Sequence, residues 1–272
     1  MPDSDIVVEL LHYDPENYRL DMPIRDGVAT ITSLERLTRD IVDLKIEVTE
    51  PADFSFVPGQ YIDLWVPESD ERRSFSMANT PGDEVELMIK CYAGGRFSAL
   101  LGGELKAGDE LRFTGPYGSF RLRDSENDVL LVAGGSGMAP VLALLRQLAG
   151  ERSSRTIRFF YGARTADDLF HLREINELGE SLPDFEFSPV LSDAEDELDW
   201  VGQRGLVHDA VGEYLKTGDS GAFETYACGP PAMIDALTEL LIEQHAVDEG
   251  RIFFDKFTTA VSDNDLGGIP ST

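Results

Sequence analysis

The chain has 272 residues, nearly twice the roughly 150 residues of an average domain, so its length predicts two domains. A hydrophobic share of 42% is large enough to build buried cores, which excludes a chain that is disordered throughout. Lys and Arg number 23 against 51 Asp and Glu, and the resulting net charge of −28 argues against a nucleic-acid or anionic-membrane partner.

Residues 1–27 are mostly polar, and we expect them to form a leader or a linker. The chain begins Met1-Pro2-Asp3-Ser4-Asp5, which lacks the positive charge of a secretory signal. No apolar run approaches the roughly 20 residues that a membrane span needs. These features predict a cytoplasmic protein.

Residues 28–125 contain short segments rich in β-branched residues, separated by turn signals such as Pro58-Gly59 and Pro81-Gly82. Many short strands with turns between them predict an antiparallel β-barrel or sandwich. One short helix is expected at residues 97–101. The predicted strands are 28–32, 41–48, 60–66, 73–77, 85–92 and 110–114.

The pattern changes in residues 126–257, where apolar strands alternate with amphipathic helices. Residues 129–133 are continuously apolar, as in a strand that is buried on both faces. This alternation predicts an α/β fold with a doubly wound parallel sheet and helices on both faces. The predicted strands are 129–133, 156–161, 185–191, 223–227 and 251–254, and the predicted helices are 141–148, 169–178, 206–215 and 232–245. Residues 258–272 are polar and Gly-rich, which predicts a flexible tail.

Two loops in the second half carry motifs that suit a nucleotide. Gly134-Gly135-Ser136-Gly137-Met138-Ala139-Pro140 lies between a predicted strand and a helix, where glycines and a helix N-terminus can receive phosphates. Cys228-Gly229-Pro230-Pro231 follows another strand, so both loops should lie at the same edge of the sheet. Taken singly, the first is an ordinary Gly-rich turn, and the second a buried Cys before a Pro-started helix.

Two segments of the first half could hold a flat, phosphorylated ligand. In Arg73-Ser74-Phe75-Ser76-Met77-Ala78-Asn79, strand alternation puts Arg73, Phe75 and Met77 on one face. Gly94-Gly95-Arg96-Phe97-Ser98 then begins the predicted short helix. Each segment alone is most often a hairpin feature.

The four motifs, in this order and with the final Phe253-Phe254-Asp255-Lys256-Phe257, resemble the ferredoxin–NADP reductase superfamily. The resemblance covers about residues 28–257. Gly-Arg-Phe-Ser and Phe-Asp-Lys-Phe are most similar to the NADH-dependent flavin reductase components of methane, propane and phenol monooxygenases. The resemblance implies an FAD-binding barrel domain at residues 28–125 and an NAD-binding domain at residues 126–257.

The resemblance also implies a role for individual residues of the barrel domain. Arg73 would bind the FAD pyrophosphate, Phe75 would pack on the flavin where many relatives carry Tyr, and the Ser76 hydroxyl would lie near flavin N5. The helix start would continue the pyrophosphate site. The implied FAD contacts are Arg73, Phe75, Ser76, Met77, Asn79, Gly95, Arg96, Phe97 and Ser98.

In the second domain the resemblance implies that NADH donates a hydride to FAD. Ser76, Cys228, Asp255 and Phe257 would lie around the reacting rings, with Phe257 as the ring cap and Phe254 as a second candidate. The implied nucleotide contacts are Gly134, Gly135, Ser136, Gly137, Pro140, Arg164, Cys228, Gly229 and Pro230.

Arg164 bears on the choice between NADH and NADPH. An Arg after the second strand can bind a 2′-phosphate, which would select NADPH. Asp167 and Asp168 would repel that phosphate, so we expect NADH. Alternatively, Arg164 only pairs with one of these two aspartates.

The resemblance implies that the electrons pass singly to a [2Fe–2S] ferredoxin domain or protein, or to an oxygenase component. The two cysteines, Cys91 and Cys228, exclude a cluster with four Cys ligands within this chain. Residues 14–23 would suit the end of such a ferredoxin domain; alternatively, the cluster protein is separate.

Other functions stay open at this point. The same scaffold serves free-flavin, nitrate and haem-protein reductases, and a non-enzymatic FAD-binding subunit is a further alternative that the intact glycine and cysteine motifs argue against. The four histidines have no metal-ligand spacing, so no metal site is expected. The acidic composition favours a soluble monomer, and it also suits salt adaptation or a basic docking partner.

Overall fold

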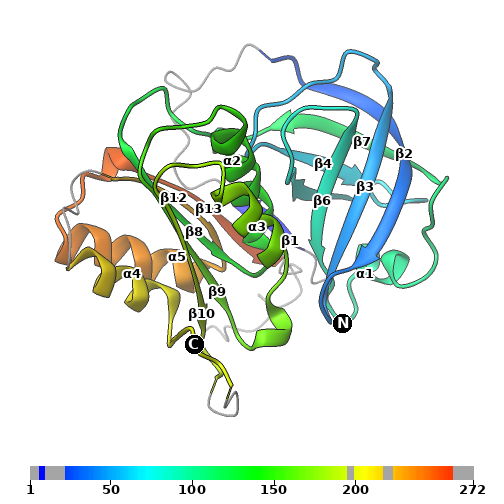
Figure 1. The fold of residues 1–272 in the computed structure, drawn as a ribbon. Helices are drawn as coiled ribbons and strands as arrows, with labels where there is room; N and C mark the ends of the chain where they lie inside the picture. The colour runs from blue at the N-terminus through cyan, green and yellow to red at the C-terminus, as the bar shows by residue number, and fades with distance from the viewer. Residues whose placement is uncertain (1–5, 10–21, 195–198, 217–222, 260–272) are drawn as a thin grey trace, which may run out of the picture.

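The computed structural model describes residues 6–9, 22–194, 199–216 and 223–259. These residues form a six-stranded antiparallel sheet followed by a seven-stranded, mostly parallel sheet with helices on both faces (Figure 1). The predicted two-domain fold, a β-barrel followed by a doubly wound α/β unit, is confirmed. The described residues do not include residues 1–5 and 10–21 of the predicted leader or residues 260–272 of the predicted tail.

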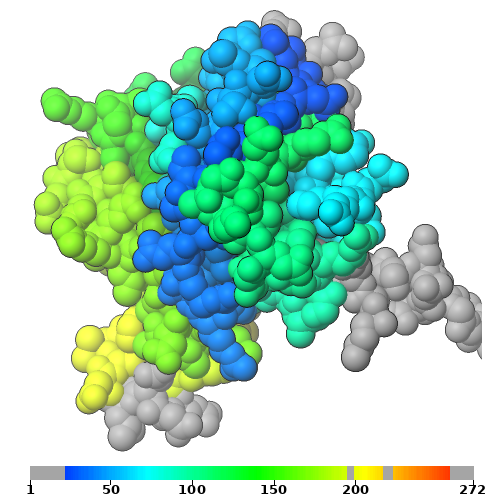
Figure 2. All heavy atoms as spheres, turned by 90° about the vertical axis from the view of Figure 1, so that its right-hand side faces the viewer, coloured from blue at the N-terminus to red at the C-terminus, as the bar shows by residue number. Residues whose placement is uncertain are grey.

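The first sheet curls into a nearly closed barrel, which occupies the middle of the face seen in Figure 2, with part of the second unit at its left. Its strand order is β5-β4-β7-β2-β3-β6, and the first and last strands approach each other where Ala78 N donates to Glu86 O at 2.8 Å. The elements are β2 (Arg25–Arg36), β3 (Ile41–Glu50), β4 (Tyr61–Trp65), β5 (Arg72–Ser76), β6 (Glu84–Lys90), α1 (Arg96–Leu101) and β7 (Glu110–Tyr117).

Strand alternation builds the barrel core. In β4, Ile62 and Leu64 are fully buried, whereas Tyr61, Asp63 and Trp65 between them are only partly buried. The barrel begins at Arg25, three residues before the predicted start, because β2 already pairs with β7 from that residue on.

The second sheet has the order β1-β13-β12-β8-β9-β10-β11, in which β1 alone is antiparallel to its neighbour. The chain moves outward from β8 to β11 on one side and then returns to β12 and β13 on the other. The carboxyl ends of β8 and β12 therefore flank a topological switch point. The strands are β1 (Ile6–Glu9), β8 (Asp128–Gly134), β9 (Ile157–Ala163), β10 (Phe185–Leu191), β11 (Gln203–Arg204), β12 (Phe223–Gly229) and β13 (Ile252–Thr259).

Two helices cover each face of this sheet. α2 (Met138–Gly150) and α3 (Leu172–Gly179) lie on the face toward the barrel, and α4 (Val207–Leu215) and α5 (Pro231–Glu239) lie on the other (Figure 1). α3 begins later than predicted, because His171 has a left-handed φ of 57° that an α-helix cannot contain. α5 ends earlier than predicted, where a π-helical turn begins at Leu240.

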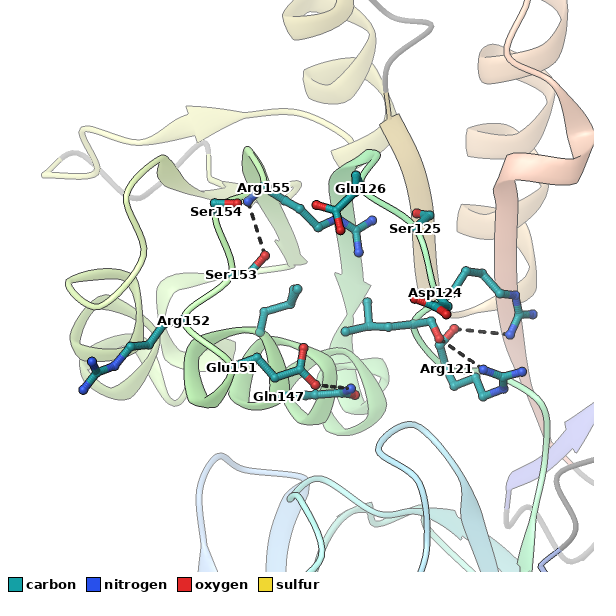
Figure 3. A pocket seen from close by; sticks show the side chains of 13 residues that line it. Arg121, Asp124, Ser125, Glu126, Gln147, Glu151, Arg152, Ser153, Ser154 and Arg155 are labelled. Atoms are coloured by element: carbon teal, nitrogen blue, oxygen red, sulfur yellow. Dashed lines mark hydrogen bonds between the residues drawn. The ribbon is translucent and has the colours of Figure 1, made fainter.

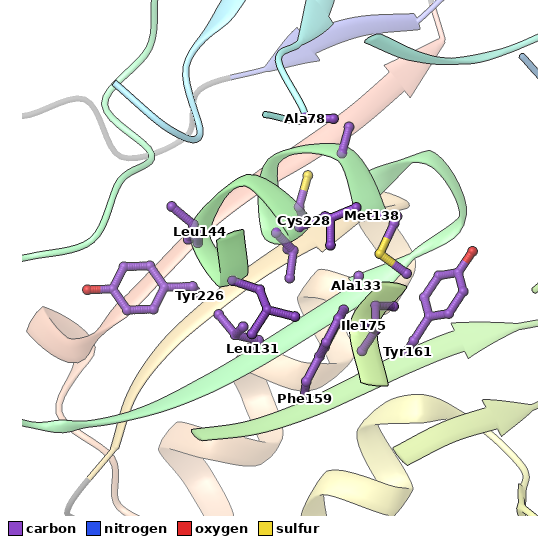
Figure 4. Packing of buried hydrophobic residues seen from close by; sticks show 14 of the residues in the cluster. Ala78, Leu131, Ala133, Met138, Leu144, Phe159, Tyr161, Ile175, Tyr226 and Cys228 are labelled. Carbon is purple, nitrogen blue, oxygen red and sulfur yellow. The ribbon is translucent and has the colours of Figure 1, made fainter. Parts of the chain in front are cut away.

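Alternate residues of β8 supply two separate cores. Leu131 and Ala133 pack under α2 together with Phe159 of β9 (Figure 4), whereas Leu130 and Val132 pack under α4 and α5. The first core also includes four barrel residues, and the barrel is thereby joined to the sheet by apolar contacts. These barrel residues are Ile41, Ala78, Met88 and Phe120.

A polar network adds to this interface. Arg146 of α2 donates from Nη1 to Glu86 Oε2 of β6 and from Nε to Glu174 Oε1 of α3, both at 2.7 Å. The same Nη1 lies 2.8 Å from the carbonyl oxygen of Ala78. One partly buried guanidinium thus connects the barrel with α2 and α3 of the second unit.

Candidate active site

The two glycine-containing loops pack against each other at the switch point. A Cβ on Gly137 would lie 2.1 Å from the carbonyl oxygen of Cys228, and a Cβ on Gly134 would lie 2.5 Å from the Met233 sulfur. Position 137 therefore needs glycine for loop packing, whereas a side chain at Gly134 would require the flexible Met233 side chain to move. Gly135 differs, because its φ is +56° and nothing lies within 4 Å of the place a Cβ would take. Its backbone is the open part of the predicted phosphate loop.

A pocket of about 530 Å³ lies at the carboxyl ends of the parallel strands. Its volume is in the range of small-molecule and cofactor sites. Gly134, Gly135, Arg164 and Pro230, all predicted nucleotide contacts, line it. The barrel supplies the opposite wall, which the sequence analysis did not anticipate, from Thr38, Arg39, Asp40, Ile41 and Lys90.

The other predicted nucleotide residues lie in the same two loops but do not line the pocket. Ser136 is buried in the short 3₁₀ turn after β8, and Pro140 lies in the first turn of α2. Cys228 is the penultimate residue of β12 and has no exposed surface, and Gly229 ends the strand. Their role in binding stays a prediction, whereas their role in joining the two loops is visible in the packing.

Arg164 is 80% exposed at the rim of this pocket. Its guanidinium pairs with Asp193 of the segment after β10, with Nη2 at 2.8 Å and Nε at 2.9 Å from Oδ2. The alternative of a pair with Asp167 or Asp168 named the wrong aspartate, because the Asp168 side chain accepts hydrogen bonds from Thr165 instead. The Asp193 carboxylate therefore neutralises the charge of the Arg164 guanidinium.

The two arginines predicted to bind pyrophosphate converge on one carboxylate. Arg73 of β5 donates from Nη2 to Glu71 Oε2 at 2.9 Å, and Arg96 of α1 donates from Nη1 to Glu71 Oε1 at 2.5 Å. Arg73 is buried, and its Nη1 also donates to the carbonyl oxygen of Arg72. Two guanidinium groups that share an anion are arranged as a pyrophosphate requires. Glu71 was missed, because nothing local marks an acidic residue two positions before an Arg.

The start of α1 borders a second pocket, of about 410 Å³, that shares Arg39 and Asp40 with the first. Gly95, Arg96 and Ser98 line it, as the resemblance implies. Ser98 Oγ accepts a hydrogen bond from Tyr92 N at 3.0 Å, which fixes the loop before the helix.

Four predicted FAD contacts have side chains that serve the barrel itself. Met77 is fully buried in its core, and the rings of Phe75 and Phe97 contact each other there with centroids 5.2 Å apart. The Asn79 side chain donates to the carbonyl oxygens of Thr80 and Glu84 and accepts from Glu86 N. Contact of these residues with FAD stays a prediction.

Ser76 Oγ on β5 and Asp255 Oδ2 on β13 are two of the eight buried side-chain polar atoms that lack a hydrogen-bond partner among the described residues. Asp255 is aligned with Cys228 in the parallel pairing of β12 and β13. Burial raises the pKa of Asp255 to about 7, and burial followed by the charge of Asp255 raises the pKa of the Cys228 thiol well above its usual value. Such unpaired polar groups are costly unless a ligand uses them.

The face on which Asp255 lies decides which aromatic residue accompanies it. Phe253 and Phe257, two positions away on either side, pack on the core shared with the barrel. Phe254 packs on the opposite core, with Lys256 Nζ 5.3 Å from its ring centroid. Phe254 is therefore wrongly placed to cap a ring at the barrel interface, and Phe257 is on the required face. Phe253 stacks on Tyr226 with centroids 5.1 Å apart, in agreement with the expected packing role.

Tyr61 is a residue influenced by Asp255 that the sequence analysis did not single out. Burial, Asp63 and then Asp255 raise the pKa of Tyr61 to about 12, so this phenol of β4 lies near the Asp255 carboxylate. Its ring stacks on Tyr117 with centroids 5.4 Å apart. Only the curvature of the barrel brings this strand to the end of β13.

These observations fit FAD and a nicotinamide nucleotide. The Arg73 and Arg96 pair can hold a pyrophosphate, Ser76 Oγ and Asp255 Oδ2 offer unused polar atoms, and Gly135 opens toward the pocket. Elsewhere, a pocket of about 480 Å³ at the amino ends of the strands is lined by residues 121–126, 147–148 and 151–155 (Figure 3). It shares no residue with the site.

Among the described residues, no group of three or more His, Cys, Asp and Glu side chains is arranged to hold a metal ion. Likewise, none of the helices in the part of the chain that the structure describes has the length and apolar character to cross a membrane.

Comparisons with known proteins identify both domains of the chain. Residues 28–122 match the oxidoreductase FAD-binding domain, and residues 131–239 match the oxidoreductase NAD-binding domain. The chain is 45% identical over 266 residues to the propane 2-monooxygenase reductase component of Mycolicibacterium goodii, which covers 96% of this chain and 76% of that protein. It is 36% identical over 264 residues to the phenol 2-monooxygenase reductase component DmpP of Pseudomonas sp. (strain CF600), with 96% and 73% covered.

Among solved structures, the Amycolatopsis cytochrome P450 reductase GcoB superimposes with a TM-score of 0.78 and 32% identity, over 86% of this chain and 70% of that one. The ferredoxin reductase in carbazole 1,9a-dioxygenase gives a TM-score of 0.77 and 30% identity over the same shares. The chain therefore belongs to the ferredoxin reductase family, as an NAD(P)H-dependent flavoprotein reductase related to the reductase components of propane and phenol monooxygenases.

Proposed function

We propose that this reductase takes its hydride from NADH and passes single electrons to an iron–sulfur ferredoxin domain or protein, or directly to an oxygenase component. The observation that carries the proposal is the pocket at the carboxyl ends of the parallel strands, which Gly135 lines, together with the buried, unpartnered oxygens of Ser76 and Asp255. The names of its relatives, which are reductase components of monooxygenases, support the same class of acceptor.

FAD, when bound, accepts two electrons as a hydride and releases them one at a time. Arg73 and Arg96 hold its pyrophosphate by charge-assisted hydrogen bonds. The Ser76 hydroxyl offers a hydrogen bond inside the interface, and Asp255 holds a proton on its carboxyl group below about pH 7. Phe257 and the barrel exclude water from the interface, which strengthens each of these interactions.

The preference for NADH rests on the charges around Arg164. Asp193 neutralises its guanidinium, and Asp40 and Asp168 also line the pocket. A 2′-phosphate would have to displace Asp193 and approach two further carboxylates. NADH has no 2′-phosphate, so its adenosine ribose would neither displace Asp193 nor bring a negative charge near the other two carboxylates.

The decisive experiment is an anaerobic titration of the FAD-loaded protein, followed by its visible spectrum. We expect NADH to bleach the flavin absorbance at lower concentration than NADPH. Asp193→Asn should improve the response to NADPH severalfold, whereas Asp167→Asn, the matched change at a neighbouring aspartate, should alter it little. A flavin spectrum that ignores both nucleotides would contradict the hydride-transfer function, and equal responses would contradict only the NADH preference.

The acceptor needs its own test. The NADH-reduced protein is mixed with a purified [2Fe–2S] ferredoxin and, separately, with a haem protein, and the reduction of each is followed spectroscopically. Faster reduction of the ferredoxin supports the proposed acceptor. Faster reduction of the haem protein favours the alternative of a haem-protein reductase.

A further inference from the structure

Glu71 is an acidic side chain that pairs with both of the arginines predicted to bind the pyrophosphate. Its two carboxylate oxygens are divided between them, Oε2 to Arg73 at 2.9 Å and Oε1 to Arg96 at 2.5 Å. The arginines come from different elements, β5 and α1, so the carboxylate also connects these elements. Glu71 itself is 41% exposed, which leaves it room to turn toward solvent.

Arg73 and Arg96 hold the Glu71 carboxylate as they would hold a bound anion. Guanidinium N–H groups prefer carboxylate and phosphate oxygens for the same reason, a planar set of donors facing an anionic acceptor. A pyrophosphate brings negative charge to the place that the Glu71 carboxylate faces, and like charges a few ångströms apart repel each other. The two anions therefore compete for the same two arginines.

Two nearby arginines, Arg72 and Arg112, pack on Trp65 and are therefore not placed to relieve this competition. Arg72, the residue between Glu71 and Arg73, points to the other side of the strand, where its guanidinium lies 4.4 Å from the Trp65 ring centroid. Arg112 covers the same ring at 4.6 Å. Both guanidinium groups are therefore on the Trp65 side of the barrel.

We propose that Glu71 is an internal counter-ion that occupies Arg73 and Arg96 until the FAD pyrophosphate displaces it, and that it thereby sets the affinity for FAD. The inference rests on the proposed FAD site. It has two opposite consequences, because the carboxylate stabilises the protein without FAD and weakens the binding of FAD. Removing its charge should lower the stability of the apoprotein and tighten the cofactor.

The test compares Glu71→Gln with the wild-type chain and with Asp70→Asn, which removes the same charge at the exposed neighbouring residue. Each full-length apoprotein is titrated with FAD, and the quenching of flavin fluorescence gives the dissociation constant. We expect Glu71→Gln to bind FAD about tenfold more tightly, equal to about 1.4 kcal/mol, and Asp70→Asn to stay within about twofold of the wild type.

A thermal melt supplies a second measurement that does not depend on catalysis. Apo Glu71→Gln should melt about 2–4 °C below the wild-type apoprotein, since each of the two guanidinium groups loses its ion pair with Glu71. With saturating FAD the difference should vanish. Inorganic pyrophosphate should inhibit FAD binding to the variant at lower concentration than it does with the wild type.

The outcomes separate this inference from the proposed function. Wild-type protein that binds FAD, together with a Glu71→Gln variant that binds it no more tightly, would overturn the counter-ion role alone. Weaker binding by the variant would also overturn it and would make Glu71 a residue that positions the arginines. Failure of every folded protein to bind FAD would overturn the FAD site and this inference together.

Discussion

Asp255 shows how a single buried carboxyl group couples stability to pH. Burial raises its pKa in the folded protein to about 7, above the ordinary value of 3.8. The stabilising contribution of the neutral form is therefore complete below about pH 4 and is lost as the pH rises through 7. Apo Asp255→Asn should be more stable than the wild type at pH 8, on the order of 2–4 kcal/mol. Urea denaturation at pH 4 and pH 8 measures the difference.

The control is Asp83→Asn, an exposed aspartate in the turn before β6, which should change the free energy of unfolding little at either pH. A stability gain in Asp255→Asn that is equally large at pH 4 would contradict the prediction, because the cause would then be packing rather than charge.

The same carboxyl group should affect hydride transfer in the opposite direction. A positive charge develops on the nicotinamide as it loses hydride, and an ionised Asp255 would stabilise that charge. The rate of flavin reduction by NADH should therefore rise as the pH passes through about 7 in the wild type and should be flatter in Asp255→Asn. Stopped-flow measurements under anaerobic conditions test this. A variant that keeps the full pH dependence would remove Asp255 from the reacting centre.

At the scale of elements, the two glycine loops act as one packed unit. Gly137→Ala would put a Cβ 2.1 Å from the carbonyl oxygen of Cys228, and neither backbone can move without shifting the other loop. We expect a loss of about 3 kcal/mol or more in the free energy of unfolding, and weaker NADH binding. Gly150→Ala, at the exposed end of α2 with nothing within 4 Å, should be neutral or stabilising by about 0.5 kcal/mol. Equal stabilities of the two variants in chemical denaturation would contradict the packing role.

The elements themselves were largely predictable from the sequence. The run of residues 129–133 is apolar at every position because β8 is buried on both faces, and this is the local signal of a parallel sheet. Less predictable were the element ends. The start of α3 depends on the left-handed backbone of His171, and no local pattern distinguishes this from a helical residue.

At the scale of the whole molecule, Arg146 joins the two units through buried charges. Glu86 is only 6% exposed, so removal of the guanidinium would leave its carboxylate buried without the cation that it pairs with. Arg146→Met should cost about 3–5 kcal/mol of unfolding free energy. Arg173→Met breaks the exposed pair of Arg173 with Glu177 on α3, and it should cost less than about 0.5 kcal/mol. Chemical denaturation of both variants measures the contrast, and comparable losses would show that the interface does not depend on Arg146.

The same network predicts how the protein responds to acid. Burial alone would raise the pKa of Glu174, but hydrogen bonds from His171 and Arg146 lower it to about 2. A lowered pKa stabilises the fold above the ordinary value of 4.5, and this stability is lost as the pH falls toward 2. Glu174→Gln should therefore lose less stability than the wild type between pH 5 and pH 2, as measured by urea denaturation. An unchanged acid dependence would show that other carboxylates control it.

The sequence by itself determined the class of fold and the order of the motifs. Turn-separated strands and an alternation of strands with helices are local patterns, and Arg73, Arg96 and the glycine loops could be recognised along the chain. Tertiary structure alone decided which residues meet. Barrel curvature and strand pairing bring together residues that are far apart in sequence. They place Glu71, Tyr61 and Asp193 beside predicted site residues. They also place Phe254 on the opposite face of the sheet.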